Sequence, residues 1–105
     1  MSTFDKREDG FEKKFALDEE QRFKAEARRN KLLGLWAAEK LGKSGDDAAA
    51  YARSVIEADF VEAGDGDVLR KVATDLAGAG VSESDVRRKM DELMGIAAAQ
   101  IKAGT

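Results

Sequence analysis

The chain has 105 residues, of which 18 are basic and 21 acidic, giving a formal net charge of -3, and it contains neither cysteine nor histidine. A domain of this length buries roughly 65% of its unfolded surface, so it can fold without disulfide or metal cross-links. The missing residue types exclude disulfides, thiolate metal sites and the commonest nucleophilic and acid/base constellations. Because the two signs of charge are balanced and interleaved, the chain has no overall field that would attract nucleic acid or an anionic membrane.

Targeting and membrane-spanning patterns are not found in the sequence. It begins MSTFDKREDGFEKK, which is charged and lacks the apolar core of a signal peptide. No window approaches the roughly eighteen apolar residues that a membrane span needs. We therefore expect a cytoplasmic protein without direct membrane insertion.

Residues 1–17 combine phenylalanines with charges of both signs. Phe4, Phe11 and Phe15 are spaced by seven and four residues and would lie on one side of a helix. Gly10 and like charges at i,i+4 spacing disfavour an isolated helix of this length. We expect a flexible segment that becomes helical in the groove of a partner, with the phenylalanines as anchors. The alternative is that Phe11 and Phe15 fold back onto the protein's own core.

The stretch from Asp18 to Gly42 predicts a long helix. Its apolar residues recur at helical spacing around Trp36, the only tryptophan, while its first half is rich in charge. We expect the first half to be solvated and the second half to be buried on most sides. Gly34 inside a helix costs about 1 kcal/mol relative to alanine, which favours a close crossing by another helix at that position. Gly42 ends the helix as a C′ residue.

Glycine stops paired with polar starts predict three further helices. They are Ser44 to about Ala63 with Asp47 completing a capping box, Val68 to Ala79 after the turn Asp65-Gly66-Asp67, and Ser82 to about Lys102 with Asp85 completing a second capping box. Gly64 and Gly80 are the predicted ends of the first two. The sequence shows no alternating strand pattern, so we expect residues 18–105 to form an all-α, four-helix bundle-like domain with a long first helix and short connections.

Two ligand motifs fail on their spacing. Gly42-Lys43-Ser44 matches the end of a phosphate-binding loop, but Ala37 stands where the first glycine belongs, and the motif follows a helix rather than a strand. Asp65-Gly66-Asp67 begins like a calcium loop, but Leu69 and Leu76 occupy two of its ligand positions. The other acidic pairs stand at helix starts, where the helix dipole favours them. We therefore predict no metal, no cofactor and no enzymatic activity.

Four stretches taken together resemble a known family. They are FDKREDGFEKKF (4–15), DEEQRFKAEARRNKLLGLWAAEKLG (18–42), ADFVEAGDGDVLRKV (58–72) and KMDEL (89–93). Through them, essentially the whole chain closely resembles the ATPase inhibitor subunit zeta of alphaproteobacterial F-type ATP synthases.

The resemblance implies a four-helix protein that binds the catalytic head of the synthase and blocks ATP hydrolysis. Its N-terminal segment would enter a catalytic α/β interface and reach the γ stalk, so the implied partners are the α, β and γ subunits. The synthase would hold the protein on the inner, cytoplasmic face of the cell membrane. Spacing and charge then divide the roles within the segment: Phe4, Phe11 and Phe15 as anchors, Arg7, Lys13 and Lys14 facing acidic groups, and Asp5, Glu8 and Glu12 facing basic ones.

Two other functions stay open. A generic helical adaptor or nucleic-acid-associated module would use the basic cluster Arg28-Arg29-Asn30-Lys31, although we interpret this cluster and Arg87-Arg88-Lys89 as solvated helix faces. A small-ligand bundle would bind around Trp36, and weak nucleotide binding by the globular part is left open.

Overall fold

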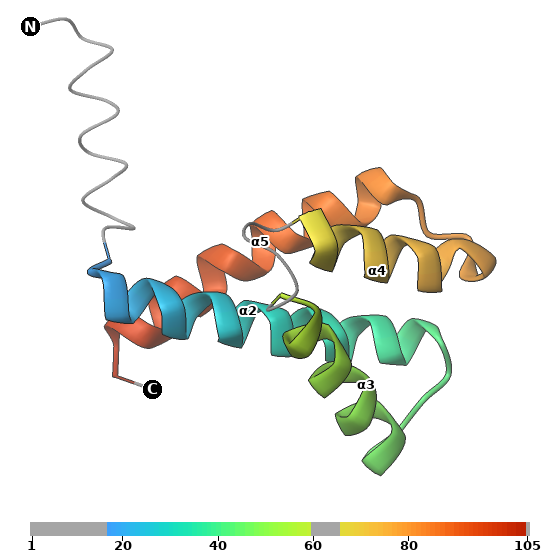
Figure 1. Cartoon of the computed structure of the whole chain (residues 1–105), viewed down its shortest axis with the longest axis horizontal. Coiled ribbons are helices and arrows are strands. Elements are labelled where there is room, and N and C mark those ends of the chain that lie inside the picture. Colours follow the sequence, from blue (N-terminus) through green and yellow to red (C-terminus); the bar gives the residue numbers. More distant parts are fainter. Residues whose placement is uncertain (1–16, 60–65, 105) are drawn as a thin grey trace, which may run out of the picture.

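The computed structural model describes residues 17–59 and 66–104. Within these ranges the chain forms four α-helices, α2 (Glu19–Lys40), α3 (Gly45–Ala58), α4 (Gly66–Leu76) and α5 (Glu83–Lys102), and one 3₁₀ turn, η1 (Ala77–Ala79). The described ranges contain no strand, which confirms the all-α class. Figure 1 shows α2 and α5 as long neighbours running in opposite directions, with α3 and α4 toward the end where α2 finishes and α5 begins.

The long helix begins and ends where the sequence predicts. Asp18 is its N-cap, and Gly42, just beyond its end, has a φ of 77°, a conformation that glycine adopts without strain. The amide of Lys43 donates to the carbonyl of Ala38 at 2.8 Å, and the amide of Gly42 donates to that of Glu39 at 3.1 Å. This is the Schellman arrangement, which satisfies the last carbonyls of a helix.

Of the two predicted serine capping boxes, one forms and one does not. Ser82 Oγ accepts the Asp85 amide at 3.1 Å, and Asp85 Oδ2 accepts the Ser82 amide at 3.2 Å, which confirms that box. The box at Ser44 and Asp47 is wrong, because the Ser44 side chain makes no capping hydrogen bond. Gly45 follows with a φ of 55°, and the Asp47 amide donates to the backbone carbonyl of Ser44 at 3.2 Å. The donor that the hydroxyl was expected to satisfy therefore already has an acceptor.

The second predicted helix is shorter than the sequence suggests, and the third begins earlier than predicted. α3 ends at Ala58 rather than near Ala63, and the predicted stop at Gly64 lies outside the described residues. α4 begins at Gly66, so the prediction that Gly66 and Asp67 belong to a turn before the helix is wrong. It ends at Leu76, and the tighter turn η1 continues to the predicted end at Ala79. Gly80 closes that turn in the left-handed conformation, with a φ of 79°, as predicted.

The hydrophobic core lies where the four described helices meet. Its buried members are Leu33 and Ala37 of α2, Val55 of α3, Val68, Val72 and Leu76 of α4, and Val86 and Met90 of α5. Trp36 packs against this core but is only partly buried, and Leu35 is 38% exposed. The second half of α2 is therefore buried on the face toward the other helices, and the expectation of burial on most sides is wrong for its outer face.

α2 and α3 cross at Gly34, as predicted. A Cβ atom built on Gly34 would stand 2.5 Å from the Cα atom of Ala52, a separation that real Cβ atoms do not reach. Only glycine lets the two backbones come this close, so the glycine that weakens the isolated helix is required by its packing.

The first half of α2 is solvated on its outer side, as predicted, but its inner side is buried. The second half of α5 lies along it (Figure 1), and the alanines between them, Ala25, Ala97 and Ala98, are buried. The outer side of this half remains in solvent, where Phe23 is 61% exposed. The buried inner side was not predicted, because the pairing of α2 with α5 is a contact between distant segments, which the charge pattern of α2 alone does not reveal.

Candidate partner-binding region

The nine residues predicted to bind the partner lie outside the described residues. They are Phe4, Asp5, Arg7, Glu8, Phe11, Glu12, Lys13, Lys14 and Phe15. The described chain begins at Leu17 and shows the base to which they are joined (Figure 1). That base has three relevant features, namely its capped helix start, the groove beside it and the contacts that hold α2 in place.

The start of α2 is fixed by a reciprocal pair of hydrogen bonds. Asp18 Oδ1 accepts the Gln21 amide at 2.7 Å, and Gln21 Oε1 accepts the Asp18 amide at 3.2 Å. Glu19 and Glu20 add negative charge to the first turn, where the helix dipole favours it. Leu17, immediately before the cap, is partly buried. The backbone at the start of α2 is therefore held by local hydrogen bonds.

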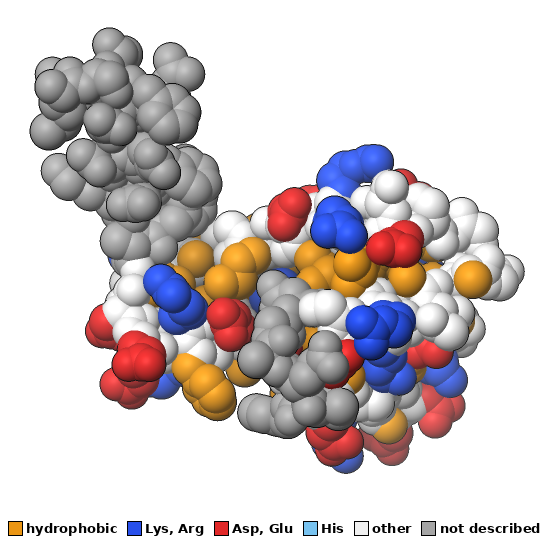
Figure 2. All heavy atoms as spheres, turned by 45° about the horizontal axis from the view of Figure 1, so that its top comes forward, with side chains coloured by type: hydrophobic (Ala, Val, Ile, Leu, Met, Phe, Trp, Pro, Cys, Tyr) orange, Lys and Arg blue, Asp and Glu red, His pale blue; other side chains and the backbone are white. Residues whose placement is uncertain are grey.

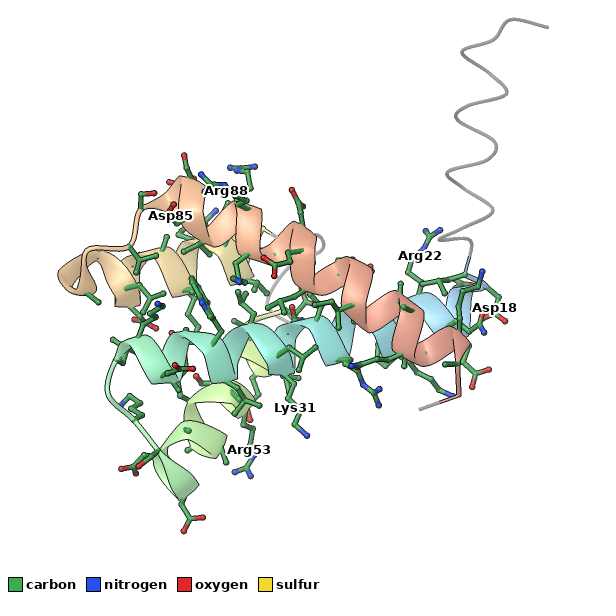
Figure 3. All side chains as sticks on the ribbon, turned by 180° about the vertical axis from the view of Figure 1, so that it is seen from behind. Asp18, Arg22, Lys31, Arg53, Asp85 and Arg88 are labelled. Carbon is green, nitrogen blue, oxygen red and sulfur yellow. The ribbon has the colours of Figure 1, made fainter. Side chains whose placement is uncertain are left out.

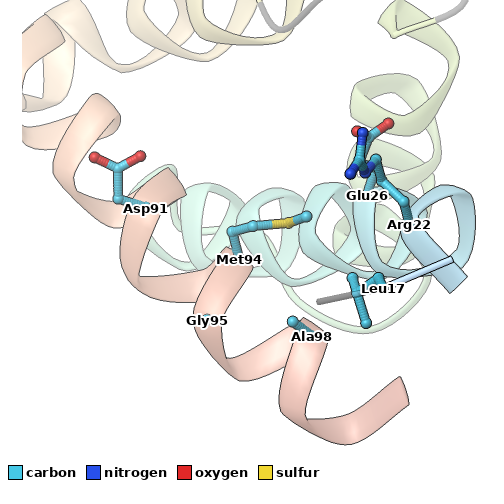
Figure 4. A pocket seen from close by; sticks show the side chains of 7 residues that line it. All are labelled: Leu17, Arg22, Glu26, Asp91, Met94, Gly95 and Ala98. Atoms are coloured by element: carbon cyan, nitrogen blue, oxygen red, sulfur yellow. The ribbon is translucent and has the colours of Figure 1, made fainter. Parts of the chain in front are cut away.

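A groove of about 480 Å³ opens beside Leu17, between the first half of α2 and the second half of α5 (Figure 4). It is lined by Leu17, Arg22, Glu26, Asp91, Met94, Gly95 and Ala98. Gly95 and Ala98 leave space here because glycine has no side chain and alanine has only a methyl group. The floor is apolar and the charges stand at the rim, an arrangement that suits an apolar side chain with charged neighbours.

Side-chain contacts along the α2/α5 seam hold the long helix against the body. Arg28 Nη1 donates to Gln100 Oε1 at 3.2 Å near one end of the seam. Near the other end, the ammonium group of Lys89 of α5 lies 5.6 Å from the centroid of the Trp36 ring of α2, within the range of cation–π attraction. Lys40, which belongs to α2 itself, lies 6.0 Å from the same ring. With the core beneath them, these contacts make α2 a fixed support over its length.

A polar cluster joins α3 to α4. The Tyr51 hydroxyl donates to Asp75 Oδ2 at 2.8 Å, and Lys71 Nζ donates to the same oxygen at 3.2 Å while lying 5.1 Å from the centroid of the Tyr51 ring. Burial, followed by the hydrogen bond and negative charge of Asp75, raises the pKa of Tyr51 well above its ordinary value of 10.0. The phenol is therefore held neutral, and the cluster is a structural tie.

Two polar residues that the sequence assigned to a solvated face are buried. Arg29 is 3% exposed and Asn30 is 1% exposed. Arg29 Nε donates to Asn30 Oδ1 at 2.9 Å, and Asn30 Nδ2 donates to Asp59 Oδ2 at 3.1 Å. The interpretation of the cluster 28–31 as a solvated face is wrong at these two positions. A signal existed in the sequence, because Arg29 follows Ala25 by four residues and so shares its helix face.

A shallow hollow of about 310 Å³ adjoins Trp36, where the small-ligand alternative would place a site. Lys89 and Arg88 line it, but so do their carboxylate neighbours: Lys89 Nζ lies 3.1 Å from Glu92 and Arg88 lies 3.7 Å from Asp85 (Figure 3). Hydrogen bonds from the backbone and side chain of Ser82 lower the pKa of Asp85, which keeps that carboxylate charged. The paired charges leave little attraction for an anionic ligand.

The surface of the described residues carries charges of both signs beside apolar side chains. Figure 2 shows hydrophobic side chains along the seam between the helices, bordered by Lys, Arg, Asp and Glu. The exposed large hydrophobic residues described are Phe23, Leu35 and Ile96. None of the described helices is long and apolar enough to cross a membrane. No group of acidic side chains within the described ranges is arranged to hold a metal ion.

Comparison with known proteins gives two matches of different kinds. A family model described as ATPase inhibitor subunit zeta matches residues 1–100. Four chains of solved structures match as well, and one of them, a solution NMR structure, is 58% identical in sequence with a TM-score of 0.72, covering 80% of this chain and 98% of its own. Comparison with curated proteins gave no match.

Proposed function

The chain belongs to the ATPase inhibitor subunit zeta family, and on that premise we propose that its N-terminal segment blocks ATP hydrolysis by entering a catalytic α/β interface of the F-type ATP synthase head, close to the γ stalk. Membership of this family makes it an inhibitor subunit that associates with the synthase. The α, β and γ subunits are the proposed contacts, and the synthase would hold the protein at the inner face of the cell membrane.

The proposal divides the chain into two working parts. Residues 1–17 are the inhibitory segment, and residues 18–105 are the globular domain that carries it. In the segment, the anchors would be Phe4, Phe11 and Phe15, with Arg7, Lys13 and Lys14 meeting acidic groups of the head and Asp5, Glu8 and Glu12 meeting basic ones.

The observation that carries the proposal is the family match, because it extends over residues 1–100 and so includes the segment as well as the body. The geometry of the base supports it. The segment joins a capped helix start at Asp18, and α2 is held by α5 along one side and by α3 at Gly34. A force that the synthase exerts on the segment would therefore act on a helix that is held by its neighbours.

The energy of such an inhibitor is that of folding coupled to binding. Ordering the segment costs about 2–5 kcal/mol of the gross interaction energy. Each phenylalanine that becomes fully buried in the interface stabilises the complex by roughly 1.5–3 kcal/mol. Two or three buried rings are therefore enough to offset the ordering cost, which is why the three phenylalanines are the residues on which we expect inhibition to depend.

Removal of residues 1–14 tests the proposal directly. We expect the truncated protein to lose inhibition of ATP hydrolysis by the purified synthase head, and Phe11→Ala in the full chain to raise the concentration for half-inhibition by about tenfold to a hundredfold. Arg53→Ala, on the exposed side of α3 (Figure 3), is the control and should inhibit as the unaltered chain does.

Thermal unfolding of the same variants separates binding from folding. The midpoint should be nearly unchanged by the truncation, because the core cluster of the described residues runs from Leu33 to Met90, far along the chain from the removed residues. A large fall in the midpoint would place the phenylalanines in the protein's own core. Full inhibition by the truncated chain would defeat the proposal outright.

A further inference from the structure

The groove beside Leu17 is not filled by the side chains that line it. It lies where the described chain begins, next to the N-terminal segment (Figure 4). Its volume of about 480 Å³ exceeds that of a single side chain. Leu17 is both the first described residue and a lining residue. The chain that precedes it therefore starts from the edge of the groove.

The floor of the groove is suited to an aromatic side chain. Met94 contributes a flexible thioether, which packs favourably against aromatic rings. Gly95 and Ala98, one residue and one turn further along α5, are too small to fill the space. Leu17 closes the floor from the other side, so the hollow is apolar between two helices that are otherwise in contact.

The length of the intervening chain points to one residue as the occupant. Phe15 precedes Leu17 by two residues, and two extended residues span about 7 Å. Side chains two apart in an extended chain point to the same side, so a backbone that directs Leu17 into the groove directs Phe15 toward it as well. Phe4 and Phe11 stand much further along the chain and have no such constraint.

Charge at the rim agrees with this occupant. Glu26 of α2 and Asp91 of α5 stand on the two sides of the groove, and Lys13 and Lys14 directly precede Phe15. Arg22 is the single cation among the three charged lining residues, so the rim carries one net negative charge. Segment and groove therefore carry complementary charges around an apolar centre.

We propose that in the free protein Phe15 occupies the groove formed by Leu17, Met94, Gly95 and Ala98, so that the inhibitory segment is docked on its own body until the synthase takes it. This regulatory role rests on the function proposed above, because docking and insertion use the same ring. The head then binds only the undocked protein. The apparent dissociation constant for the head therefore equals the intrinsic constant divided by the undocked fraction. The groove sets how readily inhibition begins.

Docking is tested in the free, full-length protein by NMR of methionine methyl groups. If Phe15 is docked, its ring shifts the Met94 methyl resonance away from the ordinary methionine position. Phe15→Leu keeps an apolar side chain but removes the ring, so the resonance should move back toward that position. Two controls are available in the chain. Phe4→Leu should leave the Met94 resonance in place, and the resonance of Met90, which belongs to the buried core, should not move in either variant. A Met94 methyl that ignores Phe15→Leu, or responds equally to Phe4→Leu, overturns the docking.

Competition is tested by inhibition of the synthase head. Met94→Ala weakens the floor and should lower the concentration for half-inhibition, by about tenfold when nine-tenths of the free protein is docked. Arg53→Ala, which is exposed on α3 and lies outside the groove, should leave this concentration unchanged. An equal or higher concentration for Met94→Ala overturns the competition even where docking is seen. An unaltered chain that fails to inhibit the head defeats the proposed function, and the NMR result stands apart from it.

Discussion

Gly34 and Ala52 bring the backbones of α2 and α3 together so closely that a Cβ atom on the glycine would lie 2.5 Å from the alanine Cα atom. The atom it meets is backbone, which cannot rotate away. Gly34→Ala gains about 1 kcal/mol in helix propensity but forces the helices apart, and overpacking of this kind costs typically 1–3 kcal/mol or more.

We therefore expect Gly34→Ala to lower the free energy of unfolding by up to about 2 kcal/mol in urea titrations. Gly78→Ala is the matched control, because a Cβ there has no heavy atom within 4 Å and the backbone is not left-handed. It should be neutral or slightly stabilising. Equal stability of the two variants would mean that α3 moves away from α2 at no cost.

The two serines before α3 and α5 should differ when each is changed to alanine. Ser82→Ala removes the acceptor of the Asp85 amide and should cost about 1 kcal/mol of unfolding free energy. Ser44→Ala should cost much less, because that hydroxyl makes no capping hydrogen bond. Thermal or urea unfolding of both variants at neutral pH measures the difference, and equal losses would show that the box at Ser44 forms after all.

The capping box of Ser82 and Asp85 makes part of the free energy of unfolding depend on pH in the acid range. Hydrogen bonds from Ser82 lower the pKa of Asp85, so the folded state holds this carboxylate charged to lower pH than the unfolded state does. Its contribution is present above the unfolded pKa and is lost as the pH falls through the folded pKa. The difference in unfolding free energy between the unaltered chain and Asp85→Asn should therefore narrow in acid, whereas Ser82→Ala keeps the backbone hydrogen bond that lowers this pKa most.

Alkaline pH should weaken the tie between α3 and α4. Burial and Asp75 raise the pKa of Tyr51, so the folded state keeps the phenolic proton where the unfolded state has lost it. The contribution of Tyr51 to the free energy of unfolding should be constant up to about pH 10 and then fall as the pH rises toward the raised pKa. Tyr51 is the only tyrosine, so its ultraviolet absorbance reports the titration without overlap.

Tyr51→Phe is the control for that measurement. It removes the titrating group and should abolish this part of the alkaline fall, while losing about 0.5–1.5 kcal/mol at neutral pH with the hydrogen bond to Asp75. A phenol that titrates in the folded protein near its ordinary pKa would contradict the buried, hydrogen-bonded arrangement.

Inhibition should depend little on pH between about 6.5 and 8, since histidine is the side chain that ordinarily changes charge there and the chain has none. Half-inhibition concentrations measured with the synthase head at several pH values across this window test the expectation. The activity of the head alone at each pH is the reference. A steep change attributable to the inhibitor would mean that a carboxylate or amine of this chain is strongly perturbed in the complex.

Local chemistry made part of the fold readable from sequence. Gly42, Gly80 and the box of Ser82 with Asp85 act through their own neighbours, and all appear as predicted. Gly34 was readable because a glycine inside a good helix needs a packing reason. Ser44 was misread because the left-handed Gly45 reroutes the hydrogen bond of the first turn.

Other features depend on contacts between distant segments. Arg29 and Asn30 are buried because α2 is covered by other helices at those positions, and Asp59 accepts a hydrogen bond there. The groove beside Leu17 likewise exists only once α5 lies along α2. The roles of the nine residues proposed to bind the synthase remain predictions from spacing and charge.

The opposed directions of α2 and α5 bring the entry and exit of the described chain to one pole of the molecule (Figure 1), where Arg28 and Gln100 are hydrogen-bonded. A purification tag or fluorophore appended after Thr105 would stand close to the start of α2, to which the proposed inhibitory segment is joined. Steric obstruction by such an attachment would imitate a loss of potency. Probes are better placed at the far pole, on the turn between α4 and α5.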